Sequence, residues 1–301
     1  MPRLSDIRIR DPFILHDEQT ATYYLYGTTD ADPWDGPGTG FASYSARDLT
    51  GDWTGPASAF VAPDGFWATT QFWAPEVHRY QGRYVMFATF ADGAGRRGTQ
   101  VLAADSPRGP FLPISDGPVT PPSWSCLDGT LHLDGAGDPW LVYCHEWTQT
   151  GDGRMVAQRL SRDLRATTGE PAILFTASQA SWTRPNGTVD GVPAFVTDGP
   201  FLITLPDGTL AMIWSSFGDD GYALGMSLSP GGSVLGPWQH EPEPLWRRDG
   251  GHGMLFTDAG GLMYVVLHGP NATPAERTIL HRVEFAGNAL RLAASPAAKN
   301  D

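Results

Sequence analysis

The stretch RYVMFATF, residues 83–90, is one of five similar apolar runs whose recurrence decides the fold. Each run is rich in aromatic and β-branched residues, and each follows a short polar turn that contains Gly, Asp or Gln. Such residues favour strands, and such turns favour hairpins. The runs begin at residues 23, 83, 139, 210 and 262, so successive copies start 60, 56, 71 and 52 residues apart.

Another apolar strand precedes each turn, and a third strand follows each run, as in DPFIL (11–15) and TQVLAADS (99–106). The order strand, turn, strand, loop, strand therefore occurs five times, with almost no helical periodicity. A β-sandwich also has short strands at regular spacing, but it does not repeat one pattern every 50 to 70 residues. The sequence therefore predicts an all-β fold, a five-bladed β-propeller.

The repeats fill almost the whole chain of 301 residues, which predicts a single propeller domain over residues 1–292. Apolar residues make up 41% of the chain and charged residues 18%, as expected for a folded protein. We expect residues 293–301 to form a disordered C-terminal tail, and the N-terminal strand to pair with the last blade. Two cysteines, Cys126 and Cys144, are too few for a disulfide framework and are expected to be thiols.

The net charge is −13, from 20 basic and 33 acidic residues. This balance argues against nucleic acid or an anionic membrane as a partner, because no basic stripe is present. No apolar stretch reaches the length of about 18 residues that a membrane span needs, and the N-terminus lacks a signal peptide's apolar run. We therefore expect a cytoplasmic protein, or a secreted one if a leader has been removed. The sequence does not indicate the oligomeric state.

The start of the first strand in each repeat aligns one set of residues: Asp11, Ala74, Asp128, Asp198 and His252. Each is followed by Pro or Gly, and Asp in that context is common turn chemistry. However, the innermost strands of a propeller surround its axis, so the three carboxyl groups should converge there. Like charges in a narrow funnel repel, and their pKa values separate. A glycosidase needs such a separation, with one carboxylate to activate water and one protonated acid to donate to the leaving oxygen.

These motifs resemble glycoside hydrolase family 43 over essentially the whole chain. RDPFIL (10–15), FWAPEVHRYQGRYVMFAT (72–89) and LDGTLHLDGAGDPWLVY (127–143) are similar to the family's first three blades, and GHGMLF (251–256) is similar to the fifth. The resemblance implies an inverting enzyme that cleaves arabinofuranosyl or xylosyl linkages in plant-type oligosaccharides or polysaccharides. A related fructan-cleaving group shares an Arg-Asp-Pro motif, but its N-terminal nucleophile motif is missing here.

Carried onto matching positions, the resemblance implies that Asp11 is the general base and that Asp128 tunes the pKa of the acid. It also implies that His252 is an axial residue that binds calcium through ordered waters. The acid itself stays open, because the family's fourth blade usually starts with Glu-Gly-Pro, whereas this chain has Asp198 before Gly-Pro. Asp198 is the acid despite its shorter side chain, or Glu146 in YCHEWTQ (143–149) donates the proton, or the acid is lost. In the last case the protein is a non-catalytic carbohydrate-binding propeller.

Aromatic and polar side chains near the strand starts are candidate contacts for the sugar. Trp73 precedes the second strand start and is expected to stack on a sugar ring, and loop aromatics could add to this surface. These loop candidates are Phe72, Trp34 and Trp182. Polar strand ends and a loop arginine are expected to bind sugar hydroxyl groups: Ser215, Ser216, His268, Asn271 and Arg184.

Overall fold

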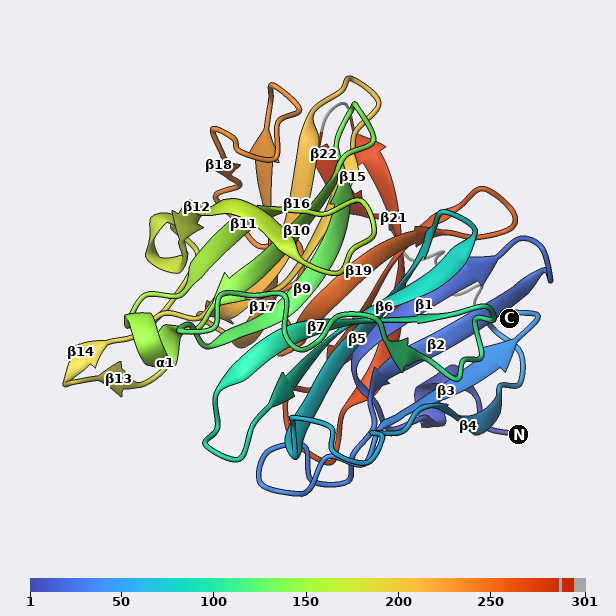
Figure 1. Cartoon of the computed structure of the whole chain (residues 1–301). Helices are drawn as coiled ribbons and strands as arrows, with labels where there is room; N and C mark the ends of the chain where they lie inside the picture. Colours follow the sequence, from blue (N-terminus) through green and yellow to red (C-terminus); the bar gives the residue numbers. More distant parts are fainter. Residues whose placement is uncertain (287–288, 295–301) are drawn as a thin grey trace.

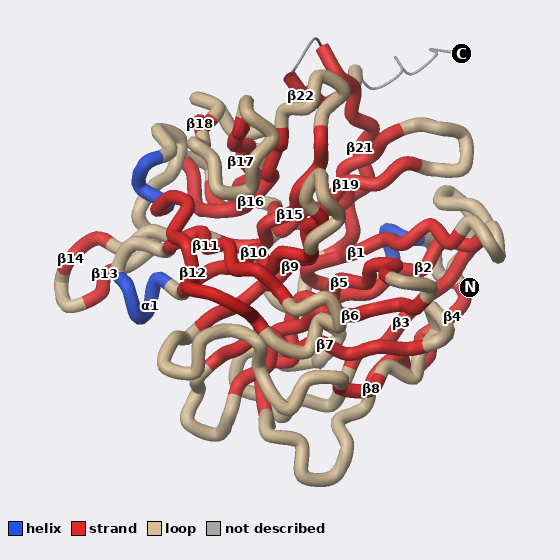
Figure 2. The backbone as a smooth tube through the Cα atoms, turned by 45° about the horizontal axis from the view of Figure 1, so that its top comes forward, coloured by secondary structure: helices blue, strands red, loops and turns tan. Residues whose placement is uncertain are grey.

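The computed structural model describes residues 1–286 and 289–294, and these residues are mostly β-structure. Five four-stranded antiparallel sheets are arranged around a common axis, as Figures 1 and 2 show. The prediction of an all-β, five-bladed propeller is confirmed. No helix in the described part of the chain is long and apolar enough to cross a membrane.

Each blade consists of four strands that follow one another in the sequence. Blade one contains β1 (Arg10–Asp17), β2 (Thr22–Thr28), β3 (Phe41–Ala46) and β4 (Thr54–Phe60). Blade two contains β5 (Thr70–Tyr80), β6 (Arg83–Ala91), β7 (Arg97–Ala104) and β8 (Leu112–Pro113). Blade three contains β9 (Cys126–Leu133), β10 (Pro139–His145), β11 (Arg154–Leu160) and β12 (Thr167–Thr176).

Blades four and five have the same order. Blade four contains β15 (Asp198–Thr204), β16 (Leu210–Gly218), β17 (Gly221–Ser229) and β18 (Gln239–His240). Blade five contains β19 (Gly251–Thr257), β20 (Met263–Gly269), β21 (Arg277–Ala286) and β22 (Ala289–Leu292). The loops add three short helices, η1 (Leu4–Asp6), α1 (Trp147–Thr150) and η2 (Ala177–Gln179), and a small hairpin of β13 (Thr188–Val189) and β14 (Val192–Pro193). Figure 1 shows α1 and this hairpin on the same side of the propeller.

The five apolar runs form the second strand of each blade, and the core lies between neighbouring blades. Every residue of β2 and of β10 is buried, because both faces of these strands are covered. One apolar cluster joins Phe87 of blade two to Leu141 of blade three, and another joins Val142 of blade three to Met212 of blade four. The runs are therefore continuous rather than alternating because each blade is packed between two others.

The two cysteines are buried free thiols, as expected. Cys126 is paired with His145 across the sheet and Cys144 with Leu127. Successive residues of a strand point to opposite faces. The two thiols consequently lie on opposite faces of blade three and join different apolar clusters.

A β-bulge of one residue interrupts the first strand of every blade at the same place. In blade one, for example, Arg10 pairs with Thr28 and the next pair is Phe13 with Tyr26. The first strand thus advances by three residues while the second advances by two, so the first strand contains one extra residue. The extra residue has a left-handed backbone with φ between 44° and 55°. Asp and His tolerate this conformation better than most residues, and bulges beside active sites redirect side chains. The bulged residues are Asp11, Ala74, Asp128, Gly199 and His252.

This register corrects the sequence alignment in blade four, where we expected Asp198 at the position of Asp11. Gly199 is the bulged residue there, and Asp198 lies one residue earlier, paired with Ser215. The sequence was ambiguous because Asp-Gly and Gly-Pro overlap, and both fit the pattern of a residue followed by Pro or Gly. Asp198 instead occupies the position directly before the bulge, which in the other blades is held by Arg10, Trp73, Leu127 and Gly251.

Hydrogen bonds join the bulges into a ring around the axis, each running from a bulge N–H to the second strand of the preceding blade. The N–H of Ala74 donates to Thr28 Oγ1 (2.9 Å) and that of Asp128 to Thr89 Oγ1 (2.8 Å). In the same way His252 donates to Ser215 Oγ (2.7 Å) and Asp11 to His268 Nδ1 (3.1 Å). Blade three has Cys144, a weak acceptor, at the equivalent place. The N–H of Gly199 donates to the carboxylate of Asp128 instead (3.0 Å).

The seam between blades five and one closes mainly through side chains. The N-terminal segment makes one isolated β-bridge to the last blade, Arg8 with Arg277, rather than the strand pairing we expected. Arg10 adds an ion pair with the fully buried Glu276 (3.0 Å). At the predicted tail, Ala293 is buried and its N–H donates to the carbonyl of Arg282 (2.9 Å), whereas residues 295–301 lie outside the described residues.

Candidate active site

The starts of the first strands and the adjoining loops enclose a cavity of about 250 Å³ at one end of the axis. Small-molecule sites commonly measure about 300–1,000 Å³, so this cavity suits a small unit such as a single sugar ring. Carboxyl groups line one part of it: Asp11, Asp128, Asp198 and Glu146. Aromatic rings line another part, namely Trp34, Trp73, Trp147, Phe217 and Tyr222. This mixture of polar groups and flat apolar faces is typical of a sugar-binding site.

Asp11 is buried among groups that favour its ionised form. Its Oδ2 accepts a hydrogen bond from Thr28 Oγ1 (2.7 Å), and its Oδ1 lies 3.3 Å from His252 Nδ1. Burial alone would raise the pKa of Asp11, but the charges of His252 and Arg10 and the hydrogen bond from Thr28 lower it to about 2. Asp11 is therefore a carboxylate at neutral pH and can accept a proton.

His268 lies directly behind Asp11 as a neutral imidazole. It is fully buried, and burial lowers the pKa of His268 to about 4. Its Nδ1 accepts the N–H of Asp11, so its proton resides on Nε2, which faces Asn271 Oδ1 (3.3 Å). The 3.4 Å approach of Nδ1 to Asp11 Oδ1 is consequently not an ion pair.

Asp198 and Asp128 form a pair of carboxyl groups on the opposite side of the cavity. An oxygen of each carboxyl group lies within 4.8 Å of an oxygen of the other, so the two groups interact strongly. Burial and the mutual repulsion of the two groups raise the pKa of Asp198 well above its usual range. Burial also raises the pKa of Asp128, to about 6. The proton therefore favours Asp198, and the pair titrates as a unit.

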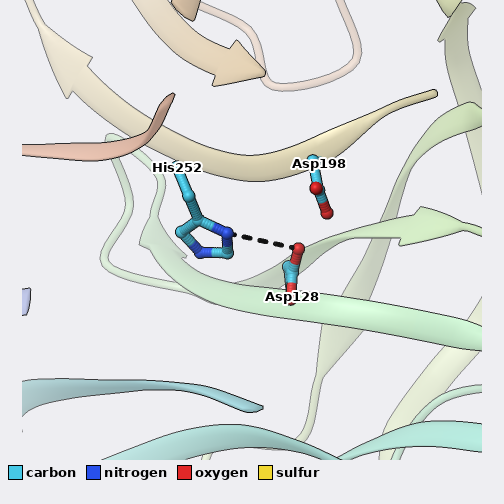
Figure 3. A group of neighbouring side chains, drawn as sticks. All are labelled: Asp128, Asp198 and His252. Carbon is cyan, nitrogen blue, oxygen red and sulfur yellow. Dashed lines mark ion pairs between the residues drawn. The ribbon is translucent and has the colours of Figure 1, made fainter. Parts of the chain in front are cut away.

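His252 stands between the two sides of the cavity. Its Nδ1 is 3.3 Å from Asp11 Oδ1 and 3.7 Å from Asp128 Oδ2. Figure 3 shows the side chains of His252, Asp128 and Asp198 converging. His252 is thus close to both Asp11 and Asp128.

The residues around His252 do not fit a directly bound calcium ion. Asp128, Asp198 and His252 can bring one ligand atom each within 4.8 Å of one another. Calcium takes 6–8 oxygen ligands, whereas this set offers an imidazole nitrogen and two carboxyl groups whose pKa values are both raised. A calcium ion that His252 binds through ordered waters stays a prediction.

Glu146 also reaches the cavity, from the residue before α1, but an arginine binds it. Arg97 of β7 donates to its carboxylate, and Ser125 Oγ is 3.4 Å away. Burial raises the pKa of Glu146, and the charge of Arg97 opposes that rise. A carboxyl group that accepts from a guanidinium is stabilised in its ionised form and has no proton to give. We therefore regard Glu146 as the partner of Arg97.

Two predicted aromatic contacts lie where a sugar could reach them. Trp73 and Trp34 both line the cavity, edge to face, with ring centroids 5.2 Å apart. The guanidinium of Arg97 lies 4.8 Å from the centroid of Trp73, and that of Arg10 lies 4.9 Å from Trp34. Trp73 Nε1 donates to the carbonyl of Pro33 (2.6 Å), which fixes the ring. The wall of blades one and two is therefore rigid and aromatic.

The predictions for Phe72 and Trp182 were wrong, because both side chains are buried in the core. Phe72 packs on Phe90 with ring centroids 4.8 Å apart, and Trp182 packs on Trp214 at 5.0 Å. Phe72 neighbours Trp73 in a strand, so the two side chains point to opposite faces.

The predicted polar contacts need similar corrections. Ser216 is fully buried away from the cavity, and Arg184 forms an ion pair with Asp219 (2.6 Å) in a separate surface depression. Ser215 accepts the N–H of His252, and His268 supports Asp11 instead of contacting sugar. Asn271 does line the cavity, where its Oδ1 accepts from Arg10 (2.8 Å).

Several residues of the site carry no recognisable signal in the sequence. Tyr222, at the start of β17, donates its hydroxyl proton to Asp198 Oδ2 (2.7 Å). Arg97, Trp147 and Asn186 also line the cavity. A tyrosine or an arginine in a strand is ordinary, and only the packing of one blade on the next brings these side chains to the axis.

Comparisons with known proteins identify the family to which the chain is similar. The model of the family described as glycosyl hydrolases family 43 matches residues 4–289. An endo-arabinase from Bacteroides thetaiotaomicron VPI-5482 is 43% identical, with 94% of this chain and 96% of that chain covered and a TM-score of 0.87.

More distant structures share the fold. An endo-1,4-beta-xylanase from the same organism is 23% identical, with 96% and 95% of the two chains covered and a TM-score of 0.79. An alpha-L-arabinofuranosidase from Lactobacillus brevis is 16% identical, with 97% of each chain covered and a TM-score of 0.75. No curated protein matches the chain.

Proposed function

The chain belongs to glycosyl hydrolases family 43 and is a glycoside hydrolase, and we propose that it hydrolyses arabinofuranosyl linkages with inversion. The opposite pKa shifts of Asp11 and Asp198 within one cavity carry the proposed acid and base roles, and inversion is what the resemblance to the family implies. An inverting glycosidase uses one ionised and one protonated carboxyl group on opposite sides of the scissile bond. The 43% identity to an endo-arabinase supports arabinofuranose over xylose as the sugar.

In the proposed mechanism, Asp11 accepts a proton from a water molecule that attacks the anomeric carbon. Asp198 donates its proton to the glycosidic oxygen as that bond breaks. After one turnover Asp11 is protonated and Asp198 is ionised. Burial disfavours ionisation of Asp198, and the nearby carboxyl group of Asp128 disfavours a second negative charge, so both keep the proton on the acid. Proton exchange with solvent then restores both groups.

The charge balance of the cavity supports a neutral substrate. Arg10 and Arg97 line the cavity, and each is already bound to a carboxylate, Glu276 and Glu146 respectively. A carboxylate on the substrate would meet Asp11 and the carboxyl pair without a free cation from either arginine. We therefore propose neutral plant-type arabinan oligosaccharides or polysaccharides as substrates, in preference to glycans rich in uronic acid.

The substrate and the stereochemistry are tested together. Wild-type protein is incubated with linear arabinan, with xylan and with nitrophenyl arabinofuranoside and xyloside, and the first-formed anomer is identified by proton NMR. We expect arabinan-type substrates to be cleaved and the anomeric configuration to be inverted. Cleavage of xylosyl substrates alone would replace the sugar in the proposal, and a retained anomer would refute inversion. Binding of arabinan oligosaccharides without any hydrolysis would favour the non-catalytic carbohydrate-binding propeller.

The identity of the acid is tested by the leaving group. Asp198→Asn should lower kcat/KM on arabinan by about 10²–10⁴-fold, but much less on an aryl glycoside whose leaving group needs no proton. Glu146→Gln should leave the dependence on the leaving group as in wild type, because Glu146 only pairs with Arg97. The reverse pattern would assign the acid to Glu146.

A further inference from the structure

Tyr222 of β17 and His268 of β20 are stacked behind the carboxyl groups of the site. Their ring centroids are 5.7 Å apart with 22° between the planes, and both side chains are almost fully buried. Each ring directs one polar atom to a different side of the site. The hydroxyl of Tyr222 donates to Asp198 Oδ2 (2.7 Å), and Nδ1 of His268 accepts the N–H of Asp11 (3.1 Å).

The place of the Tyr222 ring is created by a glycine in blade five. Gly251 is level with Asp198 and with three other residues whose side chains line the cavity, namely Arg10, Trp73 and Leu127. A Cβ atom on Gly251 would lie 2.5 Å from Tyr222 Cε1, which is closer than such atoms can approach. The ring of Tyr222 therefore fills the space that a side chain occupies in the other four blades.

The far side of the stack is also fixed. Asn271 Oδ1 faces His268 Nε2 (3.3 Å) and accepts from Arg10 (2.8 Å), while the ring of Phe217 packs on Tyr222 with centroids 5.5 Å apart. The stack thus spans from blade four, which carries Asp198, to the seam with blade one, which carries Asp11. Neither ring can shift without displacing a partner on one of the two sides.

We infer that Tyr222 and His268 are positioning residues that together set the placement of the acid and the base relative to each other. The inference rests on the proposed function, in which Asp198 is the acid and Asp11 the base. The hydroxyl of Tyr222 donates to Oδ2 of Asp198 (2.7 Å), and this bond restricts the rotation of the carboxyl group. The hydroxyl of Tyr222 therefore orients a carboxyl group that is one methylene shorter than glutamate.

Two substitutions should separate the two contacts. Tyr222→Phe keeps the stack and removes only the bond to the acid. We expect kcat/KM to fall about ten- to a hundredfold on arabinan, where the leaving group needs a proton, and to change little on an activated aryl arabinofuranoside. His268→Gln disturbs the base, which every substrate needs, so its loss should be similar for both substrates.

Tyr143→Phe is the matched control. Tyr143 is a buried tyrosine of blade three whose hydroxyl donates to Gln158 Oε1 (3.3 Å), away from the cavity. Its substitution should leave both substrates at wild-type rates, and thermal unfolding of all variants identifies any that fail to fold.

The outcomes distinguish this inference from the proposed function. If wild type cleaves neither substrate, the proposed function is wrong. If wild type is active and Tyr222→Phe behaves as Tyr143→Phe does on both substrates, the inference is overturned. An equal loss on both substrates in Tyr222→Phe would mean that the hydroxyl only maintains the fold, and it would overturn the inference as well.

Discussion

The two sides of the cavity use the same residue type for opposite purposes. On the side of blades five and one, Asp11 has a hydrogen-bond donor on Oδ2 and the charges of His252 and Arg10 close by, so its pKa falls to about 2. On the side of blades three and four, burial and a second carboxyl group nearby, that of Asp128, raise the pKa of Asp198. The difference teaches that the neighbours of an aspartate, and not its own chemistry, assign it the role of base or acid.

The backbone reinforces this contrast. Asp11 is a bulged residue whose own N–H is bound to His268, whereas Asp198 precedes the bulge of its strand. Gly199 takes the bulge in blade four and turns its N–H to Asp128 Oδ2 (3.0 Å). The backbone of Gly199, the residue after Asp198, is therefore bound to Asp128, whose charge contributes to the raised pKa of Asp198.

Removal of Asp11 is the strongest test of the base side. Asp11→Ala should lower kcat/KM by about 10³-fold or more on every substrate, because attack by water needs the base whatever the leaving group is. Steady-state kinetics on arabinan and on an activated aryl glycoside measure this loss. Asp207→Ala, in the hairpin turn between β15 and β16, is the control and should remain fully active. Full activity of Asp11→Ala would break the comparison entirely.

The acid side predicts a stability effect that depends on pH. The pKa of Asp128 is about 6 in the folded protein and about 3.9 when unfolded, so folding favours its protonated form. That contribution to stability is complete below about pH 4 and is lost as pH rises toward 6. At pH 7 the ionised group costs at most about 3 kcal/mol.

Asp128→Asn should therefore stabilise the protein at pH 7 and not at pH 4, while kcat/KM falls. Urea unfolding at both pH values measures the free energy of unfolding. An equal change at the two pH values would show that Asp128 does not bind a proton on folding. Asp134→Asn, in a hairpin turn of the same blade, is the control. The hydrogen bond from Trp140 lowers the pKa of Asp134, so this substitution should change stability with pH in the opposite direction.

The aromatic wall gives a smaller effect that is separate from both sides. Trp73→Ala should raise KM about tenfold with little change in kcat, because one stacking face is lost. Phe72→Ala, its neighbour in the strand, should leave KM unchanged and lower the free energy of unfolding by about 3–5 kcal/mol. Kinetics and urea unfolding of the two variants are compared. A normal KM in Trp73→Ala would remove this ring from the sugar site.

The smallest expected effect concerns calcium. A calcium ion that His252 binds through waters would act on the base side, where His252 and Arg10 already favour the ionised form of Asp11. Dialysis against a chelator should therefore change kcat/KM by about threefold or less. Activity is measured before dialysis, after it, and after calcium is restored. If kcat/KM falls more than tenfold and calcium restores it, the ion is needed for the action of Asp11 as the base.

The sequence predicted the blades well because their signals are local. An apolar second strand such as residues 83–90 and a polar turn before it are both readable from neighbouring residues. Asp11 and Asp128 were aligned at equivalent strand starts because each directly precedes Pro or Gly, and in the structure both are bulged residues. The residue Asp198 also met this criterion, but only the pairing of β15 with β16 shows that Gly199 is the bulge.

The remainder of the site depends on contacts between blades. Whether Phe72 or Trp73 faces the cavity is a matter of one residue in strand register, which composition does not reveal. Tyr222 reaches Asp198 because Gly251, 29 residues further along the chain, leaves room for its ring. Such contacts join residues that no local pattern connects.

The closure of the ring has a consequence for how the protein can evolve. Three interactions at the seam between blades five and one were described above. They are the hydrogen bond from the N–H of Asp11 to His268, the ion pair of Arg10 with Glu276, and the β-bridge of Arg8 with Arg277. A mutation that loosens this seam also removes the groups that keep Asp11 ionised. Selection for catalysis is then at the same time selection for a closed propeller.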